Sequence, residues 1–222
     1  MAVLLSVNLG RLRPKASGRS RHLTGIDKRP TADAVQVRAP GGKLDGLGSG
    51  LVGDEIGDHG HHGGDEQAVY AYAREELDDW EQRLGRELRN GMFGENLTTR
   101  GLVVSDAVIG ERWQIGDAVL QVTGPRIPCG TFRDHMAEQG WLRTFSVSAR
   151  SGAYLMVVTP GTVRAGDEVS VVHRPDHSVT SRLAFRALTR ERELLPDLLA
   201  AGDDLPQELH EMAEAGETYR VS

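Results

Sequence analysis

The stretch Ile115-Gly116-Asp117-Ala118-Val119-Leu120-Gln121-Val122-Thr123 decides the fold class of this chain. A Gly-Asp pair stands directly before a run of alternating, β-branched residues, which is typical of antiparallel strands joined by tight turns. The same arrangement returns where Ala165-Gly166-Asp167 precedes Glu168–His173. The regular alternation of strands and helices that marks a parallel sheet is missing. The sequence therefore predicts a mainly β fold with an antiparallel, barrel-like core.

Further strands are predicted on both sides of this stretch. Ala2–Asn8, Ala34–Arg38 and Tyr154–Thr159 are short, apolar or alternating, and bounded by turn residues. The segment 68–84 is predicted to begin as a strand and to continue as a helix, because Leu77, Trp80 and Leu84 keep helical spacing.

The C-terminal fifth of the chain has a different pattern. From Arg182 the leucines form helical stripes that are interrupted at Pro196 and Gly202, and a further helix is predicted from Leu205 to Ala215. We therefore predict two parts: a β-barrel domain over residues 1–178 and a three-helix appendage over residues 179–222.

Composition excludes several classes of protein. The chain has 222 residues, a formal net charge of −6, and 39% hydrophobic residues, values typical of a soluble globular protein that is not dedicated to nucleic acid. Its single cysteine cannot form an internal disulfide, so we expect a cytoplasmic protein. Residues 11–29 are strongly basic, which fits a small anionic ligand, a solvated arm or, as a minor alternative, a transit peptide.

That cysteine, Cys129, lies in the run Gly124-Pro125-Arg126-Ile127-Pro128-Cys129-Gly130. The two prolines remove backbone donors and stiffen the segment after the predicted strand. The cation of Arg126 favours a thiolate nearby. Local sequence alone leaves two interpretations open, a buried packing residue and a reactive thiol.

A second chemically rich segment is Asp58-His59-Gly60-His61-His62-Gly63-Gly64-Asp65, within the glycine-rich loop 39–64. Its histidines and acids are compatible with a zinc site, although no remote cluster clearly supplies further ligands. The glycine pair allows backbone amides to approach a ligand closely.

Two other segments carry candidate binding residues. In Gly25-Ile26-Asp27-Lys28-Arg29-Pro30, Pro30 favours extended geometry, so Lys28 and Arg29 are predicted to point to opposite sides, and one of them to contact an anion. In Phe93-Gly94-Glu95-Asn96-Leu97-Thr98, Asn96 or Thr98 is a candidate to hydrogen-bond a heterocycle or simply to satisfy the turn.

Taken in order along the chain, these segments resemble the MOSC-domain family, the domain found at the C-terminus of molybdenum cofactor sulfurases. The resemblance rests on the Lys28-Arg29-Pro30, His61-His62-Gly63-Gly64, Glu95-Asn96-Leu97-Thr98 and Arg126-Ile127-Pro128-Cys129 segments, and it covers roughly residues 2–215. It is closest to the small stand-alone bacterial branch.

The resemblance implies a β-barrel that binds the molybdenum cofactor (molybdopterin). It places the metal ligand at Cys129 and the partner catalytic residues at His62 and Arg29. Lys28, Gly63, Gly64, Asn96, Thr98 and Arg126 then bind the cofactor. His61 competes with His62 for its role, and Lys28 competes with Arg29 for entry into the pocket.

Stand-alone members are similar to enzymes that reduce N-hydroxylated bases and amines of the 6-hydroxylaminopurine type. The expected partners are therefore a small N-hydroxylated substrate and a flavin or iron–sulfur electron donor, without nucleic acid or membrane, and with a homodimer as the assembly considered. Two alternatives stay open: a carrier of sulfur or cofactor through a persulfide on Cys129, and a zinc hydrolase built on Asp58, His59, His61 and His62.

Overall fold

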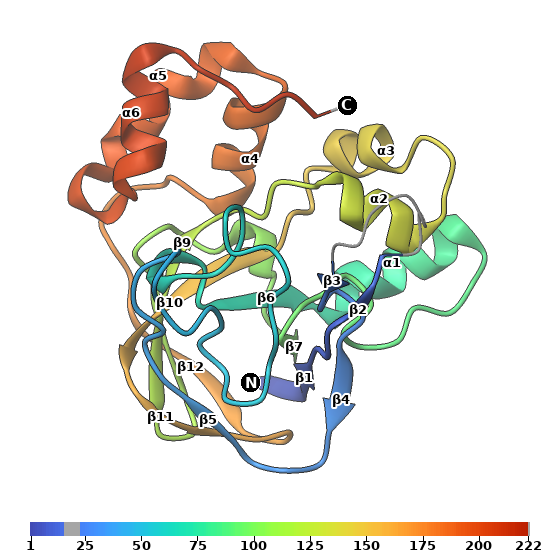
Figure 1. Cartoon of the computed structure of the whole chain (residues 1–222). Helices are drawn as coiled ribbons and strands as arrows, with labels where there is room; N and C mark the ends of the chain where they lie inside the picture. The colour runs from blue at the N-terminus through green and yellow to red at the C-terminus, as the bar shows by residue number, and fades with distance from the viewer. Residues whose placement is uncertain (16–22, 222) are drawn as a thin grey trace.

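The computed structural model describes residues 1–15 and 23–221, and a closed β-barrel forms its centre (Figure 1). The main sheet has the strand order β12-β8-β9-β10-β6-β7-β1-β4, and β12 also pairs with β1. Seven strands thus close the ring, and β4 extends it from β1. Every neighbouring pair is antiparallel except β6 and β7, so the predicted mainly antiparallel barrel is confirmed. The strands are β1 (Ala2–Leu9), β4 (Arg29–Thr31), β6 (Val69–Ala73), β7 (Leu97–Arg100), β8 (Arg112–Ile115), β9 (Ala118–Gly124), β10 (Ala153–Thr159) and β12 (Glu168–His173).

The two Gly-Asp turns lie where the sequence predicts them. Gly116 joins β8 to β9 with a φ of +52°, and a Cβ there would lie 2.4 Å from the Thr162 carbonyl oxygen, so only glycine fits. Gly166 precedes β12 with a φ of +96°. Two small antiparallel sheets lie beside the barrel: β5 (Val35–Val37) with β11 (Gly161–Val163), and β2 (Arg13–Pro14) with β3 (Leu23–Thr24).

The barrel interior is filled by apolar side chains that alternate along the strands. On β9, Ala118, Leu120 and Val122 are fully buried, while Val119 and Gln121 between them are partly exposed. Full burial of a side chain such as Leu or Val stabilises the fold by about 1.5–3 kcal/mol. The period-two pattern therefore fixes which face of β9 points inward, and with it the direction of the chain that leads to Cys129.

Three helices cover one side of the barrel: α1 (Arg74–Leu84), α2 (Gly130–Met136) and α3 (Trp141–Ser148). The predicted change from strand to helix within 68–84 is confirmed by β6 and α1. An aromatic cluster fixes α2: the Phe132 ring lies 5.2 Å from Phe93, 5.4 Å from Trp141 and 5.1 Å from Phe145, mostly edge to face. Because α2 begins directly after Cys129, this cluster fixes the chain on one side of the thiol.

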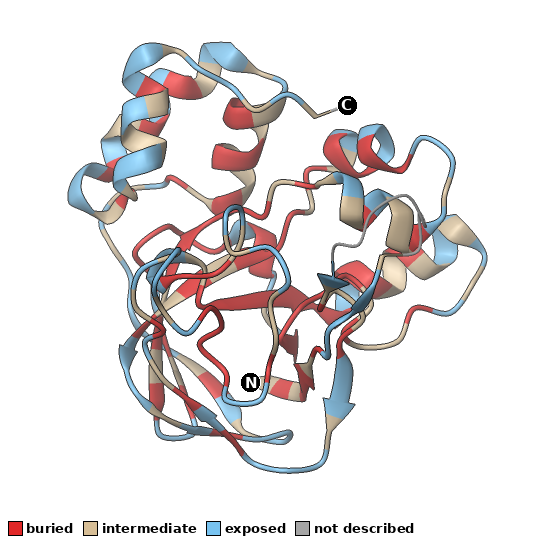
Figure 2. Ribbon diagram, viewed as in Figure 1, coloured by how far each residue is buried: buried red, intermediate tan, exposed pale blue. Residues whose placement is uncertain are grey.

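The C-terminal region is helical, as predicted, and lies at one end of the barrel (Figure 1). It contains α4 (Ser181–Thr189), α5 (Leu195–Leu198) and α6 (Gln207–Ala215), with short 3-10 turns over Arg192–Leu194 and Leu199–Asp204 between them. Two further 3-10 turns, Asp65–Gln67 and Val104–Asp106, lie earlier in the chain. Figure 2 shows buried residues on the inner faces of these helices and exposed residues outside. Ile109 of the barrel belongs to the same apolar cluster as Leu188 and Leu198, so this region packs directly on the barrel.

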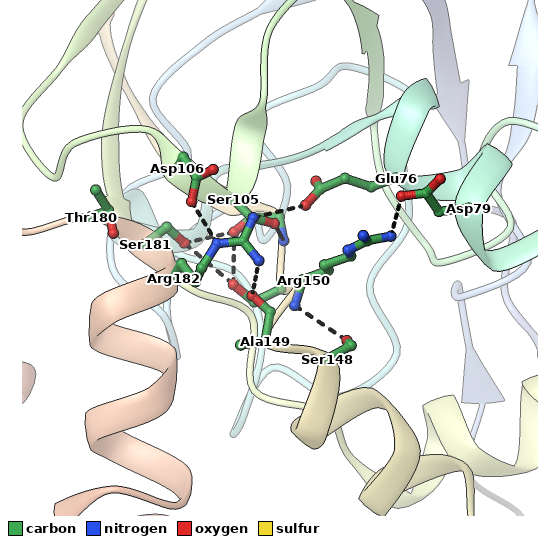
Figure 3. A network of polar contacts seen from close by, with 12 residues as sticks. Glu76, Asp79, Ser105, Asp106, Ser148, Ala149, Arg150, Thr180, Ser181 and Arg182 are labelled. Carbon is green, nitrogen blue, oxygen red and sulfur yellow. Dashed lines mark hydrogen bonds and ion pairs between the residues drawn. The ribbon is translucent and has the colours of Figure 1, made fainter.

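A polar network ties α4 to α1, to the 3-10 turn Val104–Asp106 and to the end of α3 (Figure 3). Arg182 forms ion pairs with Asp106 and with the buried Glu76, the latter at 3.6 Å, and donates to the Ala149 carbonyl at 3.2 Å. One arginine therefore joins three segments that are distant in sequence. Within residues 1–15 and 23–221, no helix has both the length and the apolar character that a membrane span requires.

Candidate functional site

The cysteine lies between a strand end and a helix start. Strand β9 ends at Gly124, the segment with Pro125 and Pro128 follows, and Cys129 directly precedes α2 in extended conformation. The side chain is neither fully buried nor exposed, and it lines two adjoining cavities. The stiff loop thus presents the sulfur to a hollow, which favours the reactive-thiol interpretation over simple packing.

His62 is the histidine that faces the thiol. Its Nε2 lies 4.0 Å from Cys129 Sγ, within the range of a hydrogen bond to sulfur. Gly63 makes this approach possible: its φ is +89°, and a Cβ there would lie 2.8 Å from the Gly48 carbonyl oxygen. His61 instead points outward and pairs with Asp58 at 3.2 Å. Of the two competing histidines, the structure brings His62 to the thiol.

The thiol is acidified by its surroundings. Burial raises the pKa of Cys129, but the hydrogen bond with His62 and the positive charge of Arg126 outweigh burial and lower this pKa from 9.0 to about 6. At neutral pH the sulfur is then mostly thiolate, the form that ligates soft metals and attacks electrophiles.

Arg126 is the buried cation of the site. Its guanidinium stacks on Tyr70 at 5.0 Å and on Phe132 at 4.6 Å, and it donates to the Phe93 carbonyl. Only 6% of the residue is exposed, and its Nε has no hydrogen-bond partner among the described residues. A buried donor left unpaired costs about 1–3 kcal/mol, so holding this cation in the wall of the cavity costs the fold some stability.

Lys28 and Arg29 point to different sides, as the sequence predicts. Lys28 is buried, lines the cavity with Cys129, and pairs with both carboxylate oxygens of Asp54. Arg29 lies on β4, is 58% exposed, and pairs with Asp27 at 3.1 Å. The prediction of Arg29 as a catalytic residue beside the thiol is therefore corrected: extended geometry before Pro30 turns it away, and Lys28 enters instead.

Three predicted cofactor contacts have other partners in the structure. Thr98 is fully buried and joins Asn8 to Glu95, so it has no surface left for a ligand. The Gly64 amide donates to the Gly48 carbonyl at 3.0 Å and does not face the cavity. Asn96 does line the cavity, but its amide group donates to Asp54 at 2.9 Å and accepts from the Tyr70 backbone. Thr98 and Gly64 thus support the walls of the site but do not line its cavity.

Sequence reasoning did not single out Tyr154. This half-buried residue of β10 lines both the inner cavity of about 90 Å³ and the outer cleft of about 790 Å³. Burial raises the pKa of its phenol, against the lowering effect of Arg126, so it stays protonated. The only signal was its place at the start of a predicted strand. The outer cleft is completed by Leu209 and Tyr219 of the C-terminal region.

The zinc alternative gains no support from the described residues. In that part of the chain, no group of three or more His, Cys, Asp or Glu side chains converges as metal ligands would. His61 pairs with Asp58, His62 faces Cys129, and the His59 ring lies beside Gly48. The three histidines therefore point to three different places.

Comparison with known proteins agrees with this arrangement. The MOSC domain family model matches residues 58–170, which include both His62 and Cys129. The chain belongs to the MOSC-domain family. It is 31% identical to the uncharacterized protein YflK of Bacillus subtilis over 183 residues, 82% of this chain and 79% of that protein. It also resembles YiiM of Escherichia coli, at 31% identity over 56% of this chain and 57% of that protein.

Solved structures place this MOSC protein with the stand-alone, YiiM-like members. YiiM from Geobacillus stearothermophilus superposes with a TM-score of 0.76 at 25% identity, covering 97% of this chain and 99% of that one. A protein of Gibberella moniliformis named "Reductase" is 29% identical over 208 residues. The match covers 92% of this chain but only 35% of the fungal protein, so this chain spans about a third of that relative.

Proposed function

We propose that this MOSC protein binds the molybdenum cofactor and reduces N-hydroxylated bases or amines of the 6-hydroxylaminopurine type. The observation that carries the proposal is the Cys129 thiolate, which faces His62 in a cavity that also holds the buried cation Arg126. Membership of the MOSC family and a relative named as a reductase support it.

The donor groups that line the inner cavity and the adjoining outer cleft suit such a cofactor chemically. A thiolate with a pKa of about 6 is a soft ligand suited to molybdenum, while the positive charges of Arg126 and Lys28 in the cavity wall suit an anionic ligand. Cys129 would hold the metal, and Arg126 with Lys28 would orient the pterin part. When bound, the cofactor supplies the two-electron reduction that no side chain of this protein can perform.

The protein's own residues would manage protons and access. Removal of the hydroxyl oxygen as water consumes two electrons and two protons and leaves the amine. His62, whose Nε2 lies 4.0 Å from the sulfur, would deliver a proton to the departing oxygen. Tyr154 lies where the inner cavity opens into the outer cleft, and its protonated phenol would hydrogen-bond the substrate's N-hydroxyl group. The electrons would come from a separate flavin or iron–sulfur protein.

The test is turnover with a small electron donor, which removes the need for the partner protein. Protein loaded with cofactor should reduce 6-hydroxylaminopurine repeatedly when supplied with reduced methyl viologen. His62→Gln should lower the turnover number by about 10²-fold or more, as for other proton donors, whereas His61→Gln on the outer side should not. Absence of turnover in loaded wild-type protein would refute the reductase proposal.

A carrier role is the second candidate, because the same acidic thiol lines the outer cleft of about 790 Å³. In that case Cys129 would carry a persulfide or the cofactor for delivery to another protein. A carrier gives at most one equivalent of product per chain, whereas a reductase exceeds one equivalent and continues. The turnover assay therefore separates the two functions directly.

A further inference from the structure

A third hollow, of about 380 Å³, adjoins the thiol cavity and is lined by an excess of positive charge. Its described lining contains four cations, Arg13, Lys15, Arg29 and Arg89, against the carboxylates of Asp27 and Asp134. The protein as a whole carries a formal net charge of −6, so this local excess runs against the overall balance.

Three of the arginines converge on one carboxylate. Asp27 pairs with Arg13 at 3.5 Å, with Arg29 at 3.1 Å, and with Arg89. A carboxylate carries one negative charge, so two positive charges of this cluster stay uncompensated by it. The pKa of Arg89 is lowered, first by burial and then by the charge of Arg29, which is the effect expected of crowded cations. The cluster is therefore arranged to gain from a second anion.

The hollow lies directly beside the thiol cavity. Ile26, Thr24, Lys15 and Thr131 line both. Thr131 is the second residue after Cys129, so their Cα atoms lie within about 7 Å of each other. This short separation suits a ligand of nucleotide size, with its base toward the thiol and its phosphate among the arginines.

The exposure of the cluster indicates a ligand that exchanges with solvent. The side chains of Arg13 and Arg29 are 62% and 58% exposed, whereas Lys28 and Arg126 of the thiol cavity are buried. A resident cofactor is usually enclosed, while a substrate must enter and leave. Guanidinium groups also match phosphate oxygens in geometry, often with two hydrogen bonds each.

We propose that the hollow between Arg13, Arg29 and Arg89 binds the phosphate of a phosphorylated substrate, so that the protein acts on a nucleotide form of its N-hydroxylated compound. The phosphate site stands on geometry and charge alone. Its assignment to the substrate rests on the proposed function.

Calorimetry with inorganic phosphate, AMP and adenosine tests the site without requiring turnover. The variant R13Q/R29Q removes two exposed cations of the cluster, and R11Q is the matched control, because Arg11 is 69% exposed on the same arm, pairs with Glu55 and does not line the hollow. Wild type and R11Q should bind phosphate and AMP alike, and R13Q/R29Q roughly tenfold or more weakly, with adenosine hardly affected by the variant. If the double variant does not fold, the single variant R13Q should show the same effect in smaller measure.

Equal binding of phosphate by all three proteins, or no binding by any, would overturn the proposal. Phosphate binding that disappears when the protein is loaded with cofactor would also overturn it, by giving the hollow to the cofactor's own phosphate. Binding that persists in loaded protein supports a substrate phosphate. Since calorimetry measures binding only, failure of the reductase assay would leave this result intact, and the reverse also holds.

Discussion

The acidity of Cys129 is the property of the site that a solution experiment can measure most cleanly, and replacement of His62 is the perturbation that probes it. The pKa of about 6, against 9.0 for an unperturbed thiol, corresponds to about 4 kcal/mol of preference for the thiolate. The His62 hydrogen bond is the largest influence that lowers this pKa, followed by the charge of Arg126. His62→Ala should therefore raise the Cys129 pKa by about 1–2 units.

The acidity of Cys129 is measured by the midpoint of its pH titration and not by its reaction rate at a single pH. At pH 7 a thiol of pKa 6 is about nine-tenths ionised, but its lower basicity weakens it as a nucleophile, so its alkylation at pH 7 is only a few-fold faster than that of an ordinary thiol. The assay is the pH dependence of absorbance at 240 nm and of the iodoacetamide rate. Because Cys129 is the only cysteine, subtracting the titration of Cys129→Ala leaves the signal of this one thiol.

His61→Ala is the matched control for this titration. His61 neighbours His62 in sequence, is largely exposed and pairs with Asp58, so its loss should leave the midpoint near 6. A wild-type midpoint above 8, or equal shifts in the two variants, would refute the account of how the thiol is acidified.

Three further predictions concern stability. Burial raises the pKa of Glu76 to about 7, against the lowering effects of Ser105 and Arg182, so the unfolding free energy should fall by up to about 3 kcal/mol as the pH rises from 4.5 to 7. Glu76→Gln should remove this pH dependence of the unfolding free energy, measured by urea titration at several pH values. An unchanged pH dependence would contradict the assignment to Glu76. Asp54→Asn leaves the buried Lys28 without its counter-charge and should cost about 3–5 kcal/mol in chemical denaturation, while a cost below 1 kcal/mol would mean that water already reaches the lysine. Phe132→Ala opens the aromatic cluster behind α2 and should cost about 3–5 kcal/mol in the same assay, so a loss under 1 kcal/mol would show that this ring does not fix the helix that follows Cys129.

The barrel could be predicted from sequence because its signals are local. The Gly-Asp turns at Gly116 and Gly166 and the alternation along β9 depend on neighbouring residues only, so they are legible without a structure. The parallel pairing of β6 with β7 was not predicted, since the connection between them runs through α1 and a loop whose path depends on the aromatic cluster.

The site could be predicted only where its signals are local, and its contacts between distant segments could not. Cys129 was marked by its stiff loop, but its partner lies 67 residues earlier in the chain, and only the place of His62 next to Gly63-Gly64 favoured it over His61. The opposite directions of Lys28 and Arg29 follow from Pro30, whereas the burial of Lys28 depends on Asp54, which sequence reasoning did not connect with it. Thr98 and Gly64 were predicted as ligand contacts because the sequence of a polar turn or a glycine pair is the same whether its groups hydrogen-bond a ligand or other parts of the protein.

The central claim is that Cys129 holds the molybdenum of a bound cofactor, and metal analysis tests it most directly. Wild-type protein and Cys129→Ala are purified from a host that makes the cofactor, and the molybdenum bound per chain is measured by mass spectrometry. The account predicts molybdenum near one equivalent in the wild type and at least about tenfold less in the variant. Absence of molybdenum from the wild type, or equal amounts in the two proteins, would contradict it.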